Sequence, residues 1–163
     1  MSADWSKLRE VDPLADGRVR LEFTIPLAEL PRLRPQLARV EGSVTGHVSF
    51  DHDQGFAIAA VEVAGSAALT CQRCLQAVDV PLAIEGRVAL VADAVEAERA
   101  PAGLETILAP AHRISLRDLV EEEVLLALPI VPRHAAERCA PGGNSGETHR
   151  PFARLEELFK RAE

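Results

Sequence analysis

Residues 40–63 read VEGSVTGHVSFDHDQGFAIAAVEV, and this stretch decides the fold. In its first half, apolar residues at positions 44, 48 and 50 alternate with serine, threonine and histidine, which is the period of a half-buried strand. Residues 51–55 predict a hairpin turn, because Asp and Gly favour tight turns. Residues 56–63 predict the returning strand, so the stretch indicates an antiparallel pair with one buried face.

The flanking sequence extends this pair into a larger sheet. Residues 18–25 alternate apolar and polar side chains, a further strand is expected at about 67–71, and apolar residues between 78 and 90 predict its return. Leucines at near-helical spacing in 27–39 indicate at most a short helical turn, because Pro31 and Pro35 interrupt it. The expected core is a strongly curved, barrel-like antiparallel meander.

Residues 115–128 predict a helix after the sheet. Ser115 and Asp118 have the spacing of an N-cap and its N3 residue, an apolar stripe follows, and Pro129 ends the pattern. A second, short amphipathic helix is expected at 151–161, after a flexible linker at 140–150, and 92–113 is expected to be an acidic loop. The predicted fold class is therefore α+β, with one domain spanning 1–163: a curved antiparallel sheet and two C-terminal helices.

Composition narrows the functional classes. The chain has 163 residues and a formal net charge of −7, with 47% hydrophobic and 26% charged residues, which is typical of a globular domain. The negative charge argues against a broadly basic face of the kind that binds duplex DNA. Because no apolar run approaches about 20 residues and the N-terminus is polar, no membrane segment is predicted and a cytoplasmic protein is expected.

The three cysteines form a pattern with one histidine. Cys71 and Cys74 make a C-x-x-C between two predicted strands, and His134 and Cys139 follow the predicted helix. Two thiolates in a sharp turn can share one soft cation, so we predict a tetrahedral zinc site from these four residues. The alternative is a turn with two small cysteines and a free Cys139. A redox dithiol is disfavoured, because that motif leads into a helix and 75–90 is expected to be a strand.

An acidic run begins inside the predicted helix. Glu121 and Glu122 are expected to point outward, with Glu123 near the edge of the apolar stripe. Such a face is commonly only solvated, but it could also dock a basic partner such as a ribosomal protein. The sequence contains no glycine-rich phosphate loop and no nucleophile paired with a histidine, and Asp51-His52-Asp53 is expected to be turn chemistry.

Three blocks resemble the YceD family: LTCQRC at 69–74, the run ISLRDLVEEEVLLALPIVPRH in 114–139, and RPFARL at 150–155. The similarity extends from about residue 40 to the C-terminus. It implies a non-enzymatic role in maturing or protecting 23S ribosomal RNA, together with a large-subunit ribosomal protein or assembly factor. Many relatives carry additional cysteines after the helix, where this chain has only His134 and Cys139.

A small positive corner is the candidate RNA contact. A metal would bring Arg73 beside Arg133 and His134, and Arg150 and Arg154 follow before and within the last predicted helix. Two rivals remain at this point: an enzyme that uses a dithiol or an open metal position, and an acidic adaptor that binds zinc but not RNA.

Overall fold

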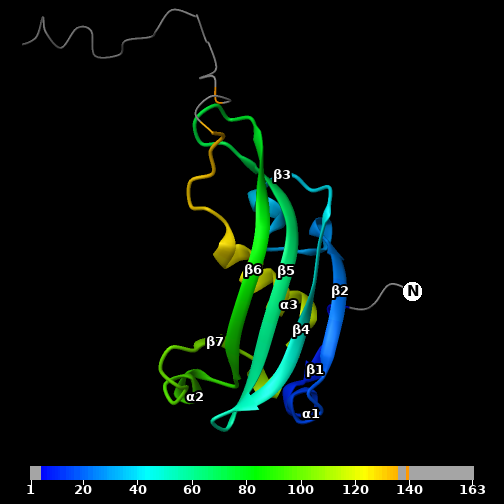
Figure 1. Ribbon diagram of the computed structural model, residues 1–163, viewed down its shortest axis with the longest axis vertical. Helices are drawn as coiled ribbons and strands as arrows, with labels where there is room; N and C mark the ends of the chain where they lie inside the picture. Colours follow the sequence, from blue (N-terminus) through cyan, green and yellow to red (C-terminus); the bar gives the residue numbers. More distant parts are fainter. Residues whose placement is uncertain (1–4, 136–138, 140–163) are drawn as a thin grey trace, which may run out of the picture.

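The computed structural model describes residues 5–135 and residue 139. Its main element is a six-stranded sheet with strand order β2-β4-β5-β6-β7, in which β3 also pairs with β5 (Figure 1). The strands are β2 (Arg20–Pro26), β3 (Leu37–Arg39), β4 (Ser43–Asp53), β5 (Phe56–Thr70), β6 (Ala77–Val91) and β7 (Glu105–Leu108). The β-rich α+β class is therefore confirmed.

The hairpin predicted from residues 40–63 is formed by β4 and β5. Asp53 pairs with Phe56, so only Gln54 and Gly55 make the turn, and both have positive φ, 50° and 87°. A two-residue turn of this kind matches the right-handed twist of the strands it joins. The expected five-residue turn was too long, because pairing continues through the Asp51-His52-Asp53 stretch.

The strands predicted at 56–63 and 67–71 are one continuous strand, β5, of 15 residues. Gly65, which lies between the two predicted strands, pairs with Val44 on one side and Leu82 on the other. A Cβ at this position would lie 3.1 Å from the carbonyl oxygen of Ser43. The glycine therefore permits a close approach of backbones inside the sheet and does not end the strand.

The expectation that residues 92–113 form an acidic loop is wrong. The segment contains helix α2 (Ala94–Ala97), strand β7 and the 3-10 turn η3 (Pro110–His112). Strand β7 pairs with β6 in the parallel direction, so the sheet is also not a purely antiparallel meander. Elements of three or four residues are too short to produce a recognisable period in the sequence.

The N-terminal part of the chain forms several short elements beside the main sheet. Strand β1 (Leu8–Glu10) pairs with β8 (Arg113–Ser115) as a separate two-stranded sheet, and helix α1 (Val11–Asp16) follows β1. No sequence pattern predicted β1 or α1. At most one short helical turn was expected in 27–39, and the structure has two separate 3-10 turns there, η1 (Leu27–Glu29) and η2 (Arg34–Gln36).

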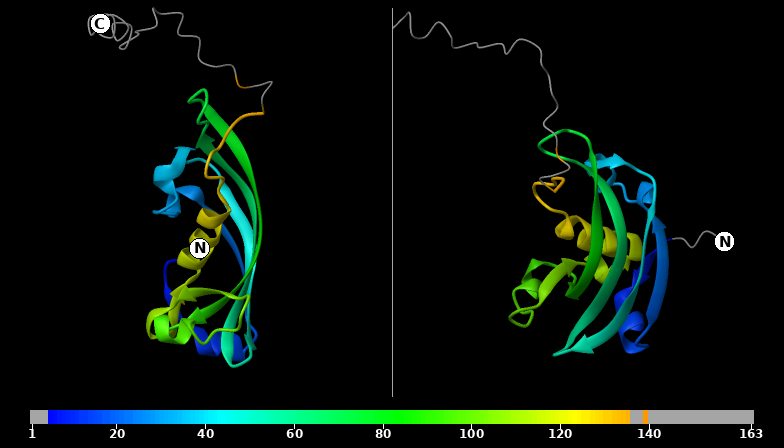
Figure 2. Two further views of the ribbon diagram at one scale, coloured as in Figure 1. Left: turned by 90° about the vertical axis from the view of Figure 1, so that its left-hand side faces the viewer. Right: turned by 45° about the horizontal axis from the view of Figure 1, so that its top comes forward.

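Helix α3 (Leu116–Ala127) confirms the predicted helix and its cap. The Asp118 backbone N–H donates to the Ser115 hydroxyl at 3.1 Å, which satisfies one of the free donors of the first turn. Figure 2 shows α3 across the concave face of the curved sheet. The side chains that are buried between helix and sheet include Leu119, Val120, Val124, Val61 and Val88.

The sheet is open and does not close into a barrel. Strands β2 and β7 end the hydrogen-bonded order, and α3 and the η turns cover the concave face instead (Figure 2). The linker predicted at 140–150 and the second C-terminal helix predicted at 151–161 lie outside the described residues. Among the residues described, no helix is long and apolar enough to cross a membrane.

Glu123 is an unusual member of the interface between α3 and β6. Its side chain is buried, and a Cβ on Gly86 of β6 would collide with its carboxylate. Its Oε1 atom has no hydrogen-bond partner among the described residues. Desolvation raises the pKa of Glu123, and the charges of Glu105 and Glu122 raise it further.

Substitution of Glu123 by Gln should remove a pH-dependent loss of stability. Because the folded-state pKa is raised, the native state binds more protons than the unfolded state, and stability falls as pH rises through the unfolded pKa towards the folded pKa. Urea denaturation between about pH 4 and about pH 8 should show that the free energy of unfolding of the variant increases relative to that of the wild type as pH rises. The exposed Glu98→Gln serves as control. A wild-type advantage that grows with pH would contradict the expectation.

Candidate metal centre

The two cysteines of the C-x-x-C lie in a tight turn between β5 and β6. The Leu75 N–H donates to the Cys71 carbonyl at 2.9 Å, and the Cys71 N–H donates to the Gln76 carbonyl at 2.9 Å. Leu75, directly after the second cysteine, has a φ of 60°, in the left-handed region that side chains rarely adopt. This backbone reversal brings the Cys74 and Arg73 amides to the Cys71 side of the turn, where they lower the pKa of the Cys71 thiol.

The segment after α3 returns to this turn. The Gln72 N–H donates to the Pro132 carbonyl at 2.9 Å, so the C-x-x-C backbone is joined directly to the residues that precede His134. The backbone amide of His134 also lowers the pKa of the Cys71 thiol. Cys74 and His134, which are 60 residues apart in the sequence, thereby meet at one site.

All four predicted ligands are brought together. One ligand atom from each of Cys71, Cys74, His134 and Cys139 lies within 4.8 Å of the others. The Cys71 and Cys139 sulfurs are 3.7 Å apart, and the Cys74 sulfur is 3.3 Å from His134 Nδ1. A tetrahedral zinc ion with Zn–S near 2.3 Å and Zn–N near 2.0 Å separates its ligands by about 3.5–3.8 Å. The donor set and its spacing therefore fit such an ion.

The orientation of His134 suits a ligand. Its Nε2 lies 3.0 Å from the Ala77 carbonyl oxygen, which can only accept, so Nε2 carries the proton and donates. In the neutral ring this leaves the lone pair on Nδ1, the atom that faces the Cys74 sulfur. A backbone carbonyl that fixes the tautomer and the ring orientation is a common support of metal-binding histidines.

The electrostatics of the site distinguish two of its thiols. Hydrogen bonds from backbone amides, above all that of Cys74, lower the pKa of Cys71 to about 5, against the opposing effect of burial. Desolvation, with Cys71 and Cys74 as neighbours, raises the pKa of Cys139 to about 11. Without a cation the site therefore favours one thiolate and disfavours a second. A bound divalent cation would compensate the additional negative charge.

A redox dithiol fits this geometry less well than a metal site. The sulfur of a reactive C-x-x-C must be accessible to the partner disulfide, and Cys71 is completely buried. Cys74 leads into a turn and then into β6, as predicted, and not into a helix. The low pKa of Cys71 thus comes from amides that surround a buried sulfur.

Part of the predicted arginine corner lies at the site. Arg73 and Arg133 are exposed, and each is the chain neighbour of one member of the Gln72–Pro132 hydrogen bond. The other two predicted members, Arg150 and Arg154, lie outside the described residues. The described portion of the corner therefore consists of two cationic side chains next to a cluster of thiols.

The expectation that Glu121 points outward is wrong. Its side chain is only 1% exposed, and Oε1 accepts hydrogen bonds from the backbone N–H groups of Arg32 and Leu33, at 2.7 and 3.0 Å. The carboxylate thereby holds the 27–39 segment against α3. This contact has no signature in the sequence, because the carboxylate's partners are backbone amides.

Glu122 is the partly exposed member of the acidic run. Its carboxylate forms an ion pair with the Arg32 guanidinium, and this contact raises the pKa of Arg32. The Arg32–Glu122 ion pair and the Glu121 hydrogen bonds join the same two segments. Only Glu122 of these two glutamates remains accessible to a binding partner.

The Asp51-His52-Asp53 stretch belongs to β4 and not to the expected turn, and its side chains form surface ion pairs. Asp51 pairs with Arg18 at 3.2 Å, and Asp53 pairs with Arg87 at 2.7 Å. His52 Nε2 lies 2.9 Å from an Asp16 carboxylate oxygen. These contacts tie the β4–β5 hairpin to its neighbours, at the end of the sheet opposite the cysteine turn (Figure 1).

Comparison with known proteins places the site within a matched region. The sequence model of the family described as "Large ribosomal RNA subunit accumulation protein YceD" matches residues 59–159. A Haemophilus influenzae protein with the same description is 32% identical over 133 residues, covering 79% of this chain and 76% of that protein. No solved structure matches the chain significantly. The matched residues include the cysteine turn, α3 and Cys139.

Alanine substitutions should separate the roles of the two neighbouring glutamates. Glu121→Ala leaves two backbone donors without their acceptor and should lower the free energy of unfolding by about 1–3 kcal/mol. Glu122→Ala removes only a surface ion pair and should leave the free energy of unfolding nearly unchanged. Denaturant titration of both variants measures the difference. Equal losses would show that the Glu121 hydrogen bonds contribute little.

Proposed function

The chain belongs to the YceD family, and on that premise we propose that it promotes the accumulation and maturation of 23S ribosomal RNA during assembly of the large ribosomal subunit. It acts in the cytoplasm, as a binding protein and not as an enzyme. The observation that carries the proposal is the position of Arg73 and Arg133 beside the candidate metal centre. Precursor ribosomal RNA, with or without a large-subunit protein or assembly factor, is the proposed partner.

Zinc is the proposed cofactor, held by Cys71, Cys74, His134 and Cys139. Three sulfurs and one imidazole form a soft, closed donor set, which is typical of structural zinc and leaves no position for a reacting water. The ion would connect the β5–β6 turn with the segment after α3. The same closed set argues against the metal-dependent enzyme considered from the sequence.

The charge distribution supports a small RNA contact. With a net charge of −7 the protein as a whole repels phosphate, so attraction must come from a local cluster of cations. Arg73 and Arg133 form the start of such a cluster, and Arg150 and Arg154 are proposed to complete it. Guanidinium groups can contact phosphate in a bidentate manner, which favours arginine over lysine at a small site.

A protein contact is the second candidate for the same ribosomal role. Glu122 is accessible next to Arg32, and an acidic helix end could dock a basic ribosomal protein. This adaptor role makes no use of Arg73 and Arg133. Charge reversal at the arginines therefore separates the two candidates.

Protein that is purified without chelator should contain close to one zinc ion per chain. Cys74→Ser should lower both the zinc content and the thermal midpoint, because metal that binds only the folded state adds about 2.7 kcal/mol at a hundredfold excess over its dissociation constant. Elemental analysis and thermal unfolding, before and after chelation, measure both effects. Ser66→Ala, at an exposed strand position, is the control. A zinc-free protein with normal melting would refute the metal site.

Reversal of Arg73 and Arg133 to Glu should reduce co-purification of large-subunit precursor RNA. The wild-type association should weaken as salt rises, since contacts to phosphate release counterions. The matched control is reversal of Arg9 and Arg20 to Glu, which changes the net charge equally at exposed positions away from the cysteine turn. RNA that co-purifies from cells can be sequenced, and large-subunit RNA can be quantified after rescue of a deletion strain.

Two outcomes would count against the proposal in different ways. Full rescue by the Arg73 and Arg133 double reversal would show that this corner is not the RNA contact, and would favour the adaptor role. Normal large-subunit RNA abundance in cells without the protein would refute the ribosomal role itself.

A further inference from the structure

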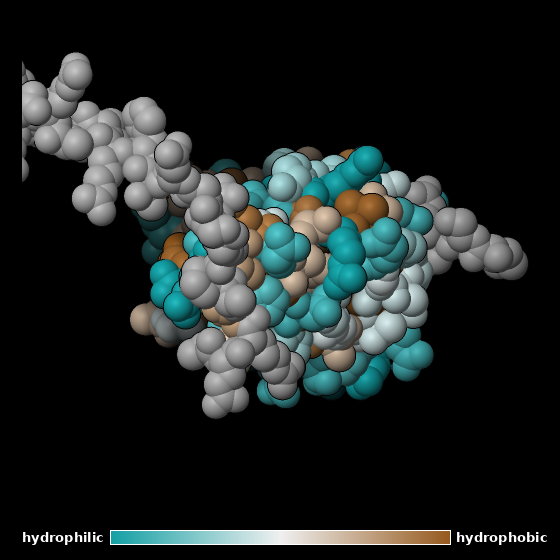
Figure 3. Space-filling model, turned by 90° about the horizontal axis from the view of Figure 1, so that it is seen from above, coloured by the Kyte–Doolittle hydropathy of each residue, from teal (hydrophilic) through white to brown (hydrophobic). Residues whose placement is uncertain are grey.

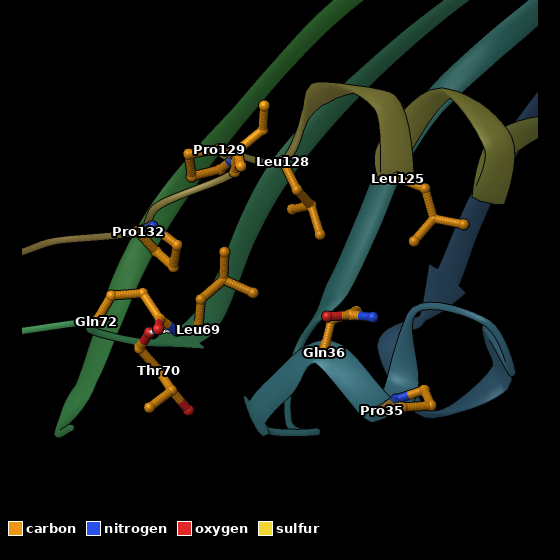
Figure 4. A pocket seen from close by; sticks show the side chains of 10 residues that line it. Pro35, Gln36, Leu69, Thr70, Gln72, Leu125, Leu128, Pro129 and Pro132 are labelled. Atoms are coloured by element: carbon orange, nitrogen blue, oxygen red, sulfur yellow. Dashed lines mark hydrogen bonds between the residues drawn. The ribbon is translucent and has the colours of Figure 1, made fainter.

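A groove of about 500 Å³ lies beside the candidate metal centre. It is bounded by the C-terminal end of α3, the end of β5 and the η2 turn, and Figure 4 shows the Leu69, Leu125 and Leu128 side chains around this space. Pro35 and Pro132 contribute further apolar surface. Its wall includes Gln72, so the groove begins one residue from Cys71.

Apolar side chains are exposed around this groove. Ile130, which lines it, is 99% exposed, and the neighbouring Leu126 is 65% exposed. Val131 and Leu75, in the same end of the molecule, are exposed as well. Figure 3 looks onto this end and shows apolar side chains open between polar ones. Adjacent exposed apolar side chains around a groove are typical of a contact surface.

We propose that residues 151–161 of the same chain dock in this groove. Phe152, Leu155, Leu158 and Phe159 recur at intervals that place them on one side of a helix, while Ala153 and Glu157 fall on the other side. An amphipathic helix of this kind buries its apolar side in a groove with leucine and proline walls. The apolar side of residues 151–161 needs an apolar surface to pack against, and the groove provides one.

The geometry of the chain places this segment within reach. The Cys139 sulfur lies 3.7 Å from that of Cys71, and the chain neighbours of Cys71, Thr70 and Gln72, line the groove. The eleven residues 140–150 can span at most about 40 Å when fully extended. A short tether gives an effective concentration on the order of millimolar, so the segment competes well with a second copy or a separate protein.

This docking does not depend on the proposed ribosomal role. If both hold, the docked segment carries Arg150 and Arg154 to the side of the metal centre where Arg73 and Arg133 lie. The corner predicted from sequence would then be assembled from three parts of the chain. The test below measures only the groove and uses no RNA.

The test compares Leu155→Asp with Ala153→Asp in the full-length protein. Both variants add the same charge, but only the first places it on the apolar side of the segment. Methyl NMR of Ile130, in the groove, should show a changed resonance in Leu155→Asp and an unchanged one in Ala153→Asp. Amide exchange in residues 125–132 should become roughly tenfold faster in Leu155→Asp. This is the change expected if the docked state is favoured over the undocked state by about ten to one and the substitution removes it.

The buried Ile84 methyl reports on the core in the same spectra. It should stay unchanged in both variants, and a change there would place the segment in the core and refute docking in the groove. An Ile130 resonance that is the same in Leu155→Asp and wild type would show that the segment leaves the groove open. An Ile130 resonance that varies with protein concentration, together with a dimer in sedimentation, would show a second copy as the occupant and overturn the proposal.

Discussion

The uninterrupted ladder between β5 and β6 is the constraint on which the rest of the structure depends. It runs from the Ala57–Leu90 pair to the Thr70–Ala77 pair with no shift in register. Because side chains alternate between the two faces, a slip of one residue would turn the core face of each strand to solvent. The ladder therefore determines where the chain reverses, and Cys71 follows directly after its last pair.

Helix α3 brings the segment that contains His134 to this cysteine turn. Its apolar stripe lies on the concave face (Figure 2), and Leu125 in its last turn lines the same groove as Gln72 in the cysteine turn. The proline-rich residues that follow cannot continue the helix, and they lead to the Gln72–Pro132 hydrogen bond. His134 thus reaches the cysteines through sheet register, helix length and one backbone contact, with no need for a long loop.

Sequence analysis succeeded where a repeated pattern or a specific chemistry was present. The alternation in β2 and β4, the Ser115 cap and the convergence of four metal-type ligands were all predicted. It failed where partners are backbone atoms or where elements are very short. Strand β7 has four residues and pairs in parallel, and Glu121 bonds to amides of the 27–39 segment. Neither feature has a side-chain period that could reveal it.

The burial of Glu121 and Glu123 weakens the case that the acidic run is a docking surface. Two of its three carboxylates lie inside the interface between α3 and its neighbours, so they add little to the charge that an approaching partner meets. Glu121 also holds the chain just before η2, and η2 forms one wall of the groove. Helix α3 therefore supports the groove through a buried carboxylate, and its C-terminal end leads to the candidate metal centre. A change in α3 would therefore affect both the groove and the four-residue cluster, because the helix connects each of them to the sheet.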